Sequence, residues 1–341
     1  MRASIESILD VLGMPDTRFF VPVFQRVYAW TAAQCDQLLV DALQAAQTGQ
    51  PHFVGTLIYL PEDKCSEERI ALVNVIDGQQ RLTTITLLLT ALRGYLRTSG
   101  AQGASLAERL DEEYLRLPDG KAKLVLSEAD APTLEALVVD LGTGALPEEP
   151  SKLLIDNLKR FTNRFNSEGF DAESLMHGLA YLHVVAVELD AHDAPQQVFE
   201  SLNAKGRPLT TADLLRNTLM MVYGFEEQER LFGLYWEPIE DAFRTFAPDQ
   251  DLYIDAALHQ WLAGSAPHIS AGKRNELYTA FTSYLDGAKE RGVQLEDMLS
   301  SLSKTCLAFA ADPSSVEAKA HLDWVVDKPK GLISQRKIFG D

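Results

Sequence analysis

Five consecutive residues, Asp77-Gly78-Gln79-Gln80-Arg81, combine a carboxylate, a glycine, two amides and a guanidinium. Glycine permits a tight turn and a close approach of the backbone, and a guanidinium offers the planar fork of donors that suits phosphate. A helix that begins here would also present free N–H groups and the positive end of its dipole, which together hold an anion. The run therefore predicts an anion site of the phosphate type. The simpler alternative is that Asp77 caps the helix and Arg81 pairs with a surface carboxylate.

A buried strand and an amphipathic helix are expected on either side of this turn. Apart from Asn74, residues 72–76 are apolar and mostly β-branched, which is typical of a strand covered on both faces. After the turn, leucine and isoleucine recur at three- and four-residue steps from Leu82 to Leu96, so we expect a helix that ends near Thr98. The two elements would fix the polar groups of the turn in space.

A second polar group follows an earlier predicted strand, Arg18 to Phe24. Gln25 and Arg26 fall at the end of this strand, where side chains face a cleft in many α/β folds. Tyr28 and Trp30 come just before a Thr-x-x-Gln capping box that opens a helix. For Tyr28 and Trp30, the simpler interpretation is a hydrophobic staple and core filler.

A further strand is expected from His52 to Leu60. Gly55 within it would let another backbone or a ligand approach closely. We interpret His52 as an ordinary residue at the start of this strand.

The string Ile-Asp-Gly-Gln-Gln-Arg-Leu-Thr-Thr at residues 76–84 resembles the motif of GmrSD-type, modification-dependent restriction endonucleases, a family that includes phosphorothioate-sensing members. Three further segments, residues 21–30, 52–55 and 199–209, carry the resemblance in the same order and spacing. It covers roughly residues 1–225. It implies an α/β fold with a ParB/sulfiredoxin-like mixed-sheet core, in which a Gly-x-x-Arg turn handles nucleotide phosphates.

Residue roles are implied by the same resemblance. The implied nucleotide-binding residues are Gln25, Arg26, Gly78, Gln79, Thr83, Asn203 and Arg207. The implied catalytic residues are Asp77, Gln80 and Arg81, and Asp77 would also hold a Mg²⁺ ion beside the phosphates. Hydrolysis of ATP, GTP or CTP would then rest on positioning and charge stabilisation more than on a strong base.

The segment that contains Asn203 and Arg207 is expected to lie between two helices. The first would run from Ala194 to Leu202 and stop at Gly206, and Thr210 or Thr211 would cap the second. In the alternative interpretation this motif is helix–loop–helix architecture alone. With the resemblance, Asn203 and Arg207 would reach the cleft.

Composition limits the classes of partner. The net charge of −18 argues against a broad nucleic-acid footprint, because phosphate contacts need lysine and arginine. It is compatible with a small basic patch at the opening of a cleft on an otherwise acidic protein.

The three cysteines lie far apart, which argues against structural zinc and a disulfide framework. No signal peptide or membrane span is apparent, so the expected compartment is the cytoplasm.

Several catalytic motifs are missing from the sequence. It contains no Gly-x-x-x-x-Gly-Lys P-loop, no Gly-x-Gly-x-x-Gly and no Gly-x-Ser-x-Gly elbow. None of the seven histidines lies in a His-Asn-His nuclease pattern. Relatives usually carry such a nuclease module after this region, so cleavage of DNA is not expected of this chain. A nuclease domain or subunit is instead an expected partner.

Two domains are expected. Residues 1–225 would form the sensing domain, with an insertion at about 100–170, and residues 226–341 a helical domain. At the N-terminus, Ser4 is expected to cap a first helix that carries Ile5, Ile8, Leu9 and Leu12.

Three functions remain open from the sequence. The first is a module of an anti-phage restriction system that binds, and hydrolyses, a nucleoside triphosphate with Mg²⁺. The second is a module that recognises modified DNA, carrying a phosphorothioate or a glucosylated base, with Phe24, Tyr28 and Trp30 as an apolar wall. The third is a regulatory scaffold in which the motif only stabilises the fold. A homo-oligomer is compatible with each.

Overall fold

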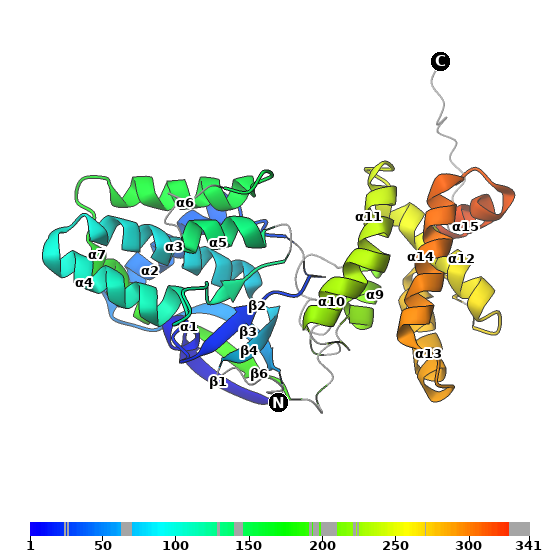
Figure 1. Ribbon diagram of the computed structural model, residues 1–341, viewed down its shortest axis with the longest axis horizontal. Helices are drawn as coiled ribbons and strands as arrows, with labels where there is room; N and C mark the ends of the chain where they lie inside the picture. Colours follow the sequence, from blue (N-terminus) through cyan, green and yellow to red (C-terminus); the bar gives the residue numbers. More distant parts are fainter. Residues whose placement is uncertain are drawn as a thin grey trace, which may run out of the picture. The chain divides into compact units, whose positions relative to one another are not determined.

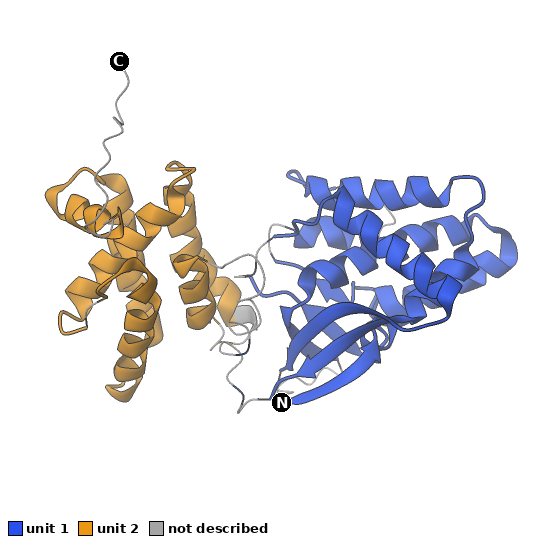
Figure 2. Cartoon of the chain, turned by 180° about the vertical axis from the view of Figure 1, so that it is seen from behind, with its two compact units in different colours: residues 1–202 blue, residues 203–341 orange. Residues whose placement is uncertain are grey.

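The computed structural model describes residues 1–23, 25, 27–62, 70–127, 130–139, 146–190, 193, 198, 210–220, 223, 225–269 and 271–326. The chain divides into two compact units, Met1–Leu202 and Asn203–Asp341 (Figure 2). The domain boundary expected at residue 225 stays a prediction, because much of the chain around the division lies outside the described residues.

A six-stranded mixed sheet forms the base of the first unit, in the order β1-β6-β3-β4-β2-β5 (Figure 1). The strands are β1 (Arg2–Ser7), β2 (Thr17–Phe20), β3 (His52–Pro61), β4 (Ala71–Asp77), β5 (Leu124–Val125) and β6 (Leu182–Glu188). The β1–β6 and β3–β4 pairs are antiparallel, and the other neighbours are parallel. The predicted α/β class with a mixed sheet is confirmed.

Most helices of this unit lie on one side of the sheet (Figures 1 and 2). They are α1 (Ile8–Leu12), α2 (Ala32–Thr48), α3 (Gln79–Arg97), α4 (Gly100–Leu110), α5 (Ala131–Val139), α6 (Lys152–Phe165) and α7 (Ala172–Ala180). The predicted capping box of α2 is present, and α3 ends at Thr98 as expected.

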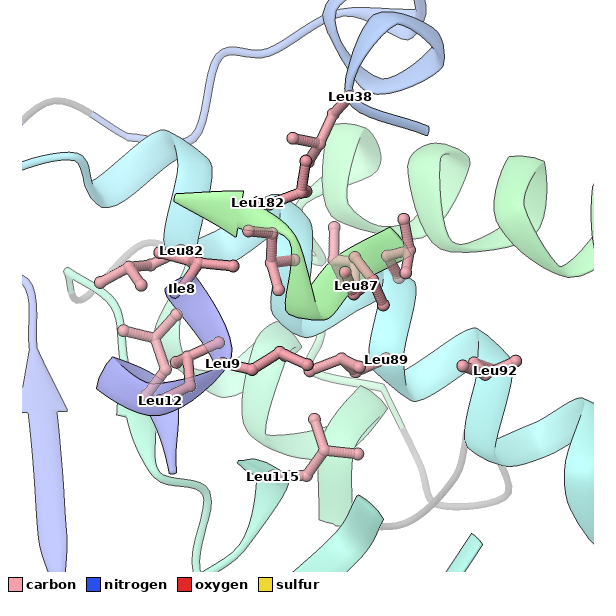
Figure 3. Packing of buried hydrophobic residues seen from close by; sticks show 14 of the residues in the cluster. Ile8, Leu9, Leu12, Leu38, Leu82, Leu87, Leu89, Leu92, Leu115 and Leu182 are labelled. Atoms are coloured by element: carbon pink, nitrogen blue, oxygen red, sulfur yellow. The ribbon is translucent and has the colours of Figure 1, made fainter. Parts of the chain in front are cut away.

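Helix α3 is the centre of the hydrophobic core. Nearly all of its residues from Gln79 to Leu96 are buried, because neighbours cover it on every side. Figure 3 shows Leu82, Leu87, Leu89 and Leu92 of α3 among leucines from α1, α2 and β6. A helix buried all round is held by packing rather than by its intrinsic propensity.

Residues 100–170 take part in the same core. They supply the edge strand β5, which pairs in parallel with β2. They also supply α5 and α6, whose Leu134, Leu154 and Phe161 are fully buried in the cluster that surrounds α3. The segment expected as an insertion therefore completes the core of the first unit.

The predicted helix at Ser4 is wrong. Residues 2–7 form β1, which pairs with β6 along its whole length. The helix begins only at Ile8, and Ser7 caps it by accepting a hydrogen bond from the Leu9 N–H at 3.2 Å. Sheet pairing overrides the helical pattern here, and it leaves Ile5, an expected core residue, 73% exposed.

A buried ion pair lies beside α3. Arg93 is fully buried and donates to the Asp111 carboxylate and to the Val138 carbonyl oxygen. Arg116 donates to the other oxygen of Asp111. The carboxylate therefore neutralises a cation that water does not reach, at the start of a short π-helical turn, Asp111–Leu115.

The second unit is helical, as predicted. Its helices are α9 (Thr211–Met220), α10 (Phe225–Leu231), α11 (Glu237–Arg244), α12 (Gln250–Ser265), α13 (Leu277–Glu290), α14 (Leu295–Ala311) and α15 (Val316–Val326), with a π-helical turn at Phe232–Trp236 and a 3-10 turn at Arg274–Glu276. Thr210 caps α9 through reciprocal hydrogen bonds with Asp213, both 3.1 Å. Among the described residues of both units, no helix is long and apolar enough to span a bilayer.

Two histidines join α12 to α15. Their Nδ1 atoms lie 2.9 Å apart, and the His259 ring stacks on Trp324 with 3.5 Å between ring centroids. Only one of the two nitrogens can carry the shared proton, so this contact requires at least one neutral ring. Burial, and then His321, lower the pKa of His259 to about 4.

Replacing Asp111 by alanine should strongly destabilise the first unit. Arg93 would remain buried without a counter-charge, which costs about 3–5 kcal/mol. Thermal unfolding checks this, with Glu113→Ala as the control, because Glu113 is an exposed carboxylate on the same turn and its ion-pair partner, Arg109, is exposed as well. Equal melting temperatures for the two variants would contradict the role given to Asp111.

Acidification should weaken the second unit through His259. Its pKa is lower in the folded chain than in the unfolded chain, so the stabilisation is complete above about pH 6.5 and is lost as the pH falls through about 4. Between pH 7 and pH 5 we expect the free energy of unfolding of the second unit to fall by about 1 kcal/mol, after allowance for solvent screening. His259→Phe keeps a ring against Trp324 and should flatten the pH dependence of the melting temperature. An unchanged pH profile in this variant would refute the assignment.

Candidate functional site

Strand β4 passes into α3 through a single residue, Gly78. Its φ of 95° and ψ of 4° lie in the left-handed region, which favours glycine. A Cβ at this position would also lie 2.7 Å from Cδ1 of Leu57. The strand–glycine–helix arrangement expected from the sequence is present, and it needs glycine for both its conformation and its space.

The Arg81 side chain extends from the first turn of α3 to β3. Its Nη1 donates a 2.8 Å hydrogen bond to the Thr56 carbonyl oxygen. The guanidinium lies directly against Gly55, which has a φ of 114°, and a Cβ built there would lie 3.0 Å from Cζ of Arg81. The register between β3 and β6 shifts at this point. A glycine-containing irregularity in β3 therefore makes room for the guanidinium.

The positive charge of Arg81 is only partly compensated. Burial lowers the pKa of its guanidinium, and the nearby Asp77 carboxylate opposes this effect. Between described residues, Arg81 forms no ion pair within 4.0 Å. Its one hydrogen-bond acceptor among them, the Thr56 carbonyl, is uncharged. The guanidinium therefore keeps a positive charge with which it could bind an anion at the start of α3.

Gln80 holds the segment 27–30, here called the aromatic loop. Its Oε1 accepts a 2.7 Å hydrogen bond from the Ala29 N–H, and its Nε2 donates a 3.2 Å bond to the Val27 carbonyl oxygen. Gln25 makes a related link, because its Nε2 donates to the Ile76 carbonyl at 3.2 Å. Both amides therefore bind backbone groups and fix this stretch of chain against β4 and α3.

Tyr28 points into the core. It is 4% exposed, and its hydroxyl lies 2.8 Å from Oγ1 of Thr84 and 3.2 Å from Nδ2 of Asn157. The Tyr28 N–H donates a 2.5 Å bond to the carboxylate of Asp130, and burial raises the pKa of the phenol. In this conformation the Tyr28 ring anchors the loop and is not offered to a ligand.

The remaining aromatic residues of the expected wall differ in position. Trp30 is half-buried and packs against the core, which agrees with its simpler interpretation. The large apolar residue that the loop exposes is Val27, at 49%. Phe24 lies outside the described residues, as do Arg26, Asn203 and Arg207.

A small cavity lies on the inner side of the turn. It measures about 10 Å³ and is lined in part by Gln79, Gln80, Thr83 and Tyr28. This is about the space of one water molecule. Thr83 is buried, and its hydroxyl donates to the Gln79 carbonyl at 2.8 Å. A nucleotide therefore does not fit in this cavity. The groups of the turn that a nucleotide could reach are those around the Arg81 guanidinium.

No ready-made metal site is present in the described part of the chain, where no three histidine, cysteine or acidic side chains converge. Asp77 ends β4 directly before the glycine and is half-buried. A single carboxylate can hold Mg²⁺ only together with phosphate oxygens and water. The donor set thus suits a metal that arrives with a nucleotide.

Two residues of this network escaped the sequence analysis. Asn157 donates to the Tyr28 hydroxyl and to the Trp30 carbonyl, and Asp130 accepts from the Tyr28 N–H. Each lies more than a hundred residues from its partner in the chain, so no local pattern could reveal it.

These features define an α/β module with a glycine turn that presents a guanidinium and a helix start. The N-terminal domain of the GmrSD restriction endonuclease matches residues 8–220, more than half of the chain. The chain therefore belongs to the GmrSD restriction endonuclease N-terminal domain family, as the motif led us to expect, and is a component of a restriction system. No curated protein matches it.

Alanine at Gly55 should displace the Arg81 guanidinium, because the new Cβ would occupy its place.

Alanine at Gly78 should lower stability by about 1–2 kcal/mol or more, through the left-handed conformation and the clash with Leu57. Gly94→Ala is the matched control, since Gly94 is an exposed residue within α3 with open space around it. We expect it to be neutral or stabilising in thermal unfolding. Equal effects at positions 78 and 94 would contradict the account of the turn.

Proposed function

We propose that this chain is the nucleotide-binding, and nucleotide-hydrolysing, sensor module of a modification-dependent restriction system that defends against phage. The observation that supports this most is the Arg81 guanidinium, which is held by Gly55 and Thr56 at the start of α3. Such a start attracts anions by its dipole. A nuclease module would respond to the state of this sensor module.

The triphosphate would lie on the Arg81 side of the turn. Arg81 would bind a phosphate through the donors that Thr56 leaves available, and the first N–H groups of α3 would bind the same or the next phosphate. Mg²⁺, when bound, would offset the phosphate charge with Asp77 as its protein ligand. Arg26 would add a second guanidinium. Hydrolysis would rest on charge stabilisation of the transition state.

Gln80 takes a different role in this proposal from the catalytic one that the resemblance implies. Both ends of its amide are engaged with the aromatic loop. It is a positioning residue, which ties the phosphate turn to the segment that would sense DNA. Asp77 and Arg81 keep the roles proposed for catalysis.

Arg81→Ala should weaken the binding of Mg²⁺·NTP by about 10–100-fold, because a charge-assisted hydrogen bond is worth about 1.5–3 kcal/mol. Arg81→Lys should restore little of the nucleotide binding, since lysine keeps the positive charge but lacks the planar fork of guanidinium donors. Thermal shift with ATP, GTP and CTP measures binding, and phosphate release measures turnover.

Arg109→Ala is the control for this experiment, because Arg109 is an exposed arginine of α4. Nucleotide binding that is equal in the wild type and the Arg81 variants would exclude the proposed site. A lower melting temperature as the only effect would favour the scaffold function instead.

The second candidate function is recognition of modified DNA by the aromatic loop. Val27 favours it, because an exposed apolar side chain on a loop fixed by several hydrogen bonds can meet a sulfur atom or a splayed base without reordering. The two functions are compatible, since Gln80 joins their sites.

A further inference from the structure

A groove of about 910 Å³ runs between α2 and α6 on the helical side of the first unit. Its floor consists of residues such as Leu39 and Phe161, which are buried and belong to the core. Its α6 side, here called the α6 wall, presents Lys159, Asn163 and Arg164, all of them exposed. The carboxylates of Asp36 and Asp156 also line the groove, and the α6 wall supplies the hydrogen-bond donors that a ligand would meet.

The charge of this helix is opposite to that of the chain. Between Lys152 and Arg164, α6 carries four basic residues and one acidic residue, whereas the whole chain has a net charge of −18. Such a local excess of cations on an acidic body attracts polyanions to one place.

Two cations of the α6 wall are uncommitted within the described residues. Neither Lys159 nor Arg164 forms an ion pair there within 4.0 Å. Arg160 differs, because its Nη1 contacts both carboxylate oxygens of Asp36 across the groove at 2.9 and 3.2 Å. Five residues separate Lys159 from Arg164, about 7.5 Å along the helix axis. They can therefore contact two different phosphate groups.

The groove begins beside the aromatic loop. Asn157, half a turn before Lys159 on α6, donates a 2.9 Å hydrogen bond to the Trp30 carbonyl oxygen. Asp36, on the opposite side, follows in α2 directly after the loop. A linear ligand in the groove would thus pass the loop.

We propose that the α6 wall binds the phosphodiester backbone of duplex DNA, with Lys159 and Arg164 as phosphate ligands and Asn163 as an uncharged donor. This deepens the proposed function and rests on it, in that DNA is taken as the partner. A partner helix would instead need exposed apolar side chains, and Val40 is the one exposed apolar residue among those lining the groove. Backbone contacts position DNA and carry no sequence information, so the wall would hold the duplex while the loop reads it.

The test uses the full chain, fluorescence anisotropy, and two duplexes of the same sequence, one plain and one with phosphorothioate linkages. Lys159→Gln/Arg164→Gln should lower the affinity for both duplexes by at least about 10-fold at 100 mM salt. It should also reduce the slope of log K against log[salt] by about 1.8, since each lost phosphate contact removes about 0.9. The ratio of the two affinities should not change.

Two further variants sharpen the result. Lys289→Gln/Lys304→Gln makes the same change of net charge at exposed lysines of the second unit and should leave binding unchanged. Asp36→Asn frees Arg160 and should raise the affinity several-fold.

Equal losses in both double variants, an unchanged salt slope, or no DNA binding by the wild type would overturn the proposal. The first would indicate a general charge effect, and the second that Lys159 and Arg164 do not contact phosphate groups. Nucleotide-induced thermal shift is measured in parallel, so failure at the α6 wall is distinguished from failure at Arg81.

Discussion

The left-handed peptide conformation at Gly78 lets β4 run into α3 with no intervening loop, and the rest of the first unit is arranged around that direct junction. The helix enters the core at once and is buried along almost its whole length. Its first turn therefore cannot shift without disturbing the packing shown in Figure 3. Arg81 belongs to this first turn, so its backbone position is fixed as well. Gly55 in β3 leaves the space that its guanidinium occupies.

A polar network extends from the same turn to segments far away in sequence. Gln80 binds the aromatic loop, Tyr28 of that loop reaches Thr84 and Asn157, and Asn157 also holds the Trp30 carbonyl. Buried polar groups are costly unless they are satisfied, so this network specifies one position for the loop. The turn, the loop and α6 are thus parts of one framework, on which phosphate binding and DNA contact can both be built.

The sequence predicted the elements whose pattern is local. The strand–glycine–helix pattern at residues 72–84, the capping box after Trp30 and the leucine spacing of α3 each predict what the structure contains. The helix expected at Ser4 failed because six pairings with β6 outweigh local propensity. The simpler interpretation of Tyr28 as core filler agrees with its burial, but its partners Thr84, Asp130 and Asn157 could not be predicted, because they lie 56 to 129 residues further along the chain. The glycine turn before Arg81 was predicted from its residue types, whereas the distant partners of its side chains were not.

The chemistry of one amide explains a choice of residue within the Asp-Gly-Gln-Gln-Arg run. Gln80 accepts from a backbone N–H with one atom and donates to a backbone carbonyl with the other. Glutamate, which has the same shape, would place an oxygen against the Val27 carbonyl, so two acceptors would face each other without a proton. Polarity and not charge or size thus restricts this position to an amide, even though the next residue is the positively charged Arg81.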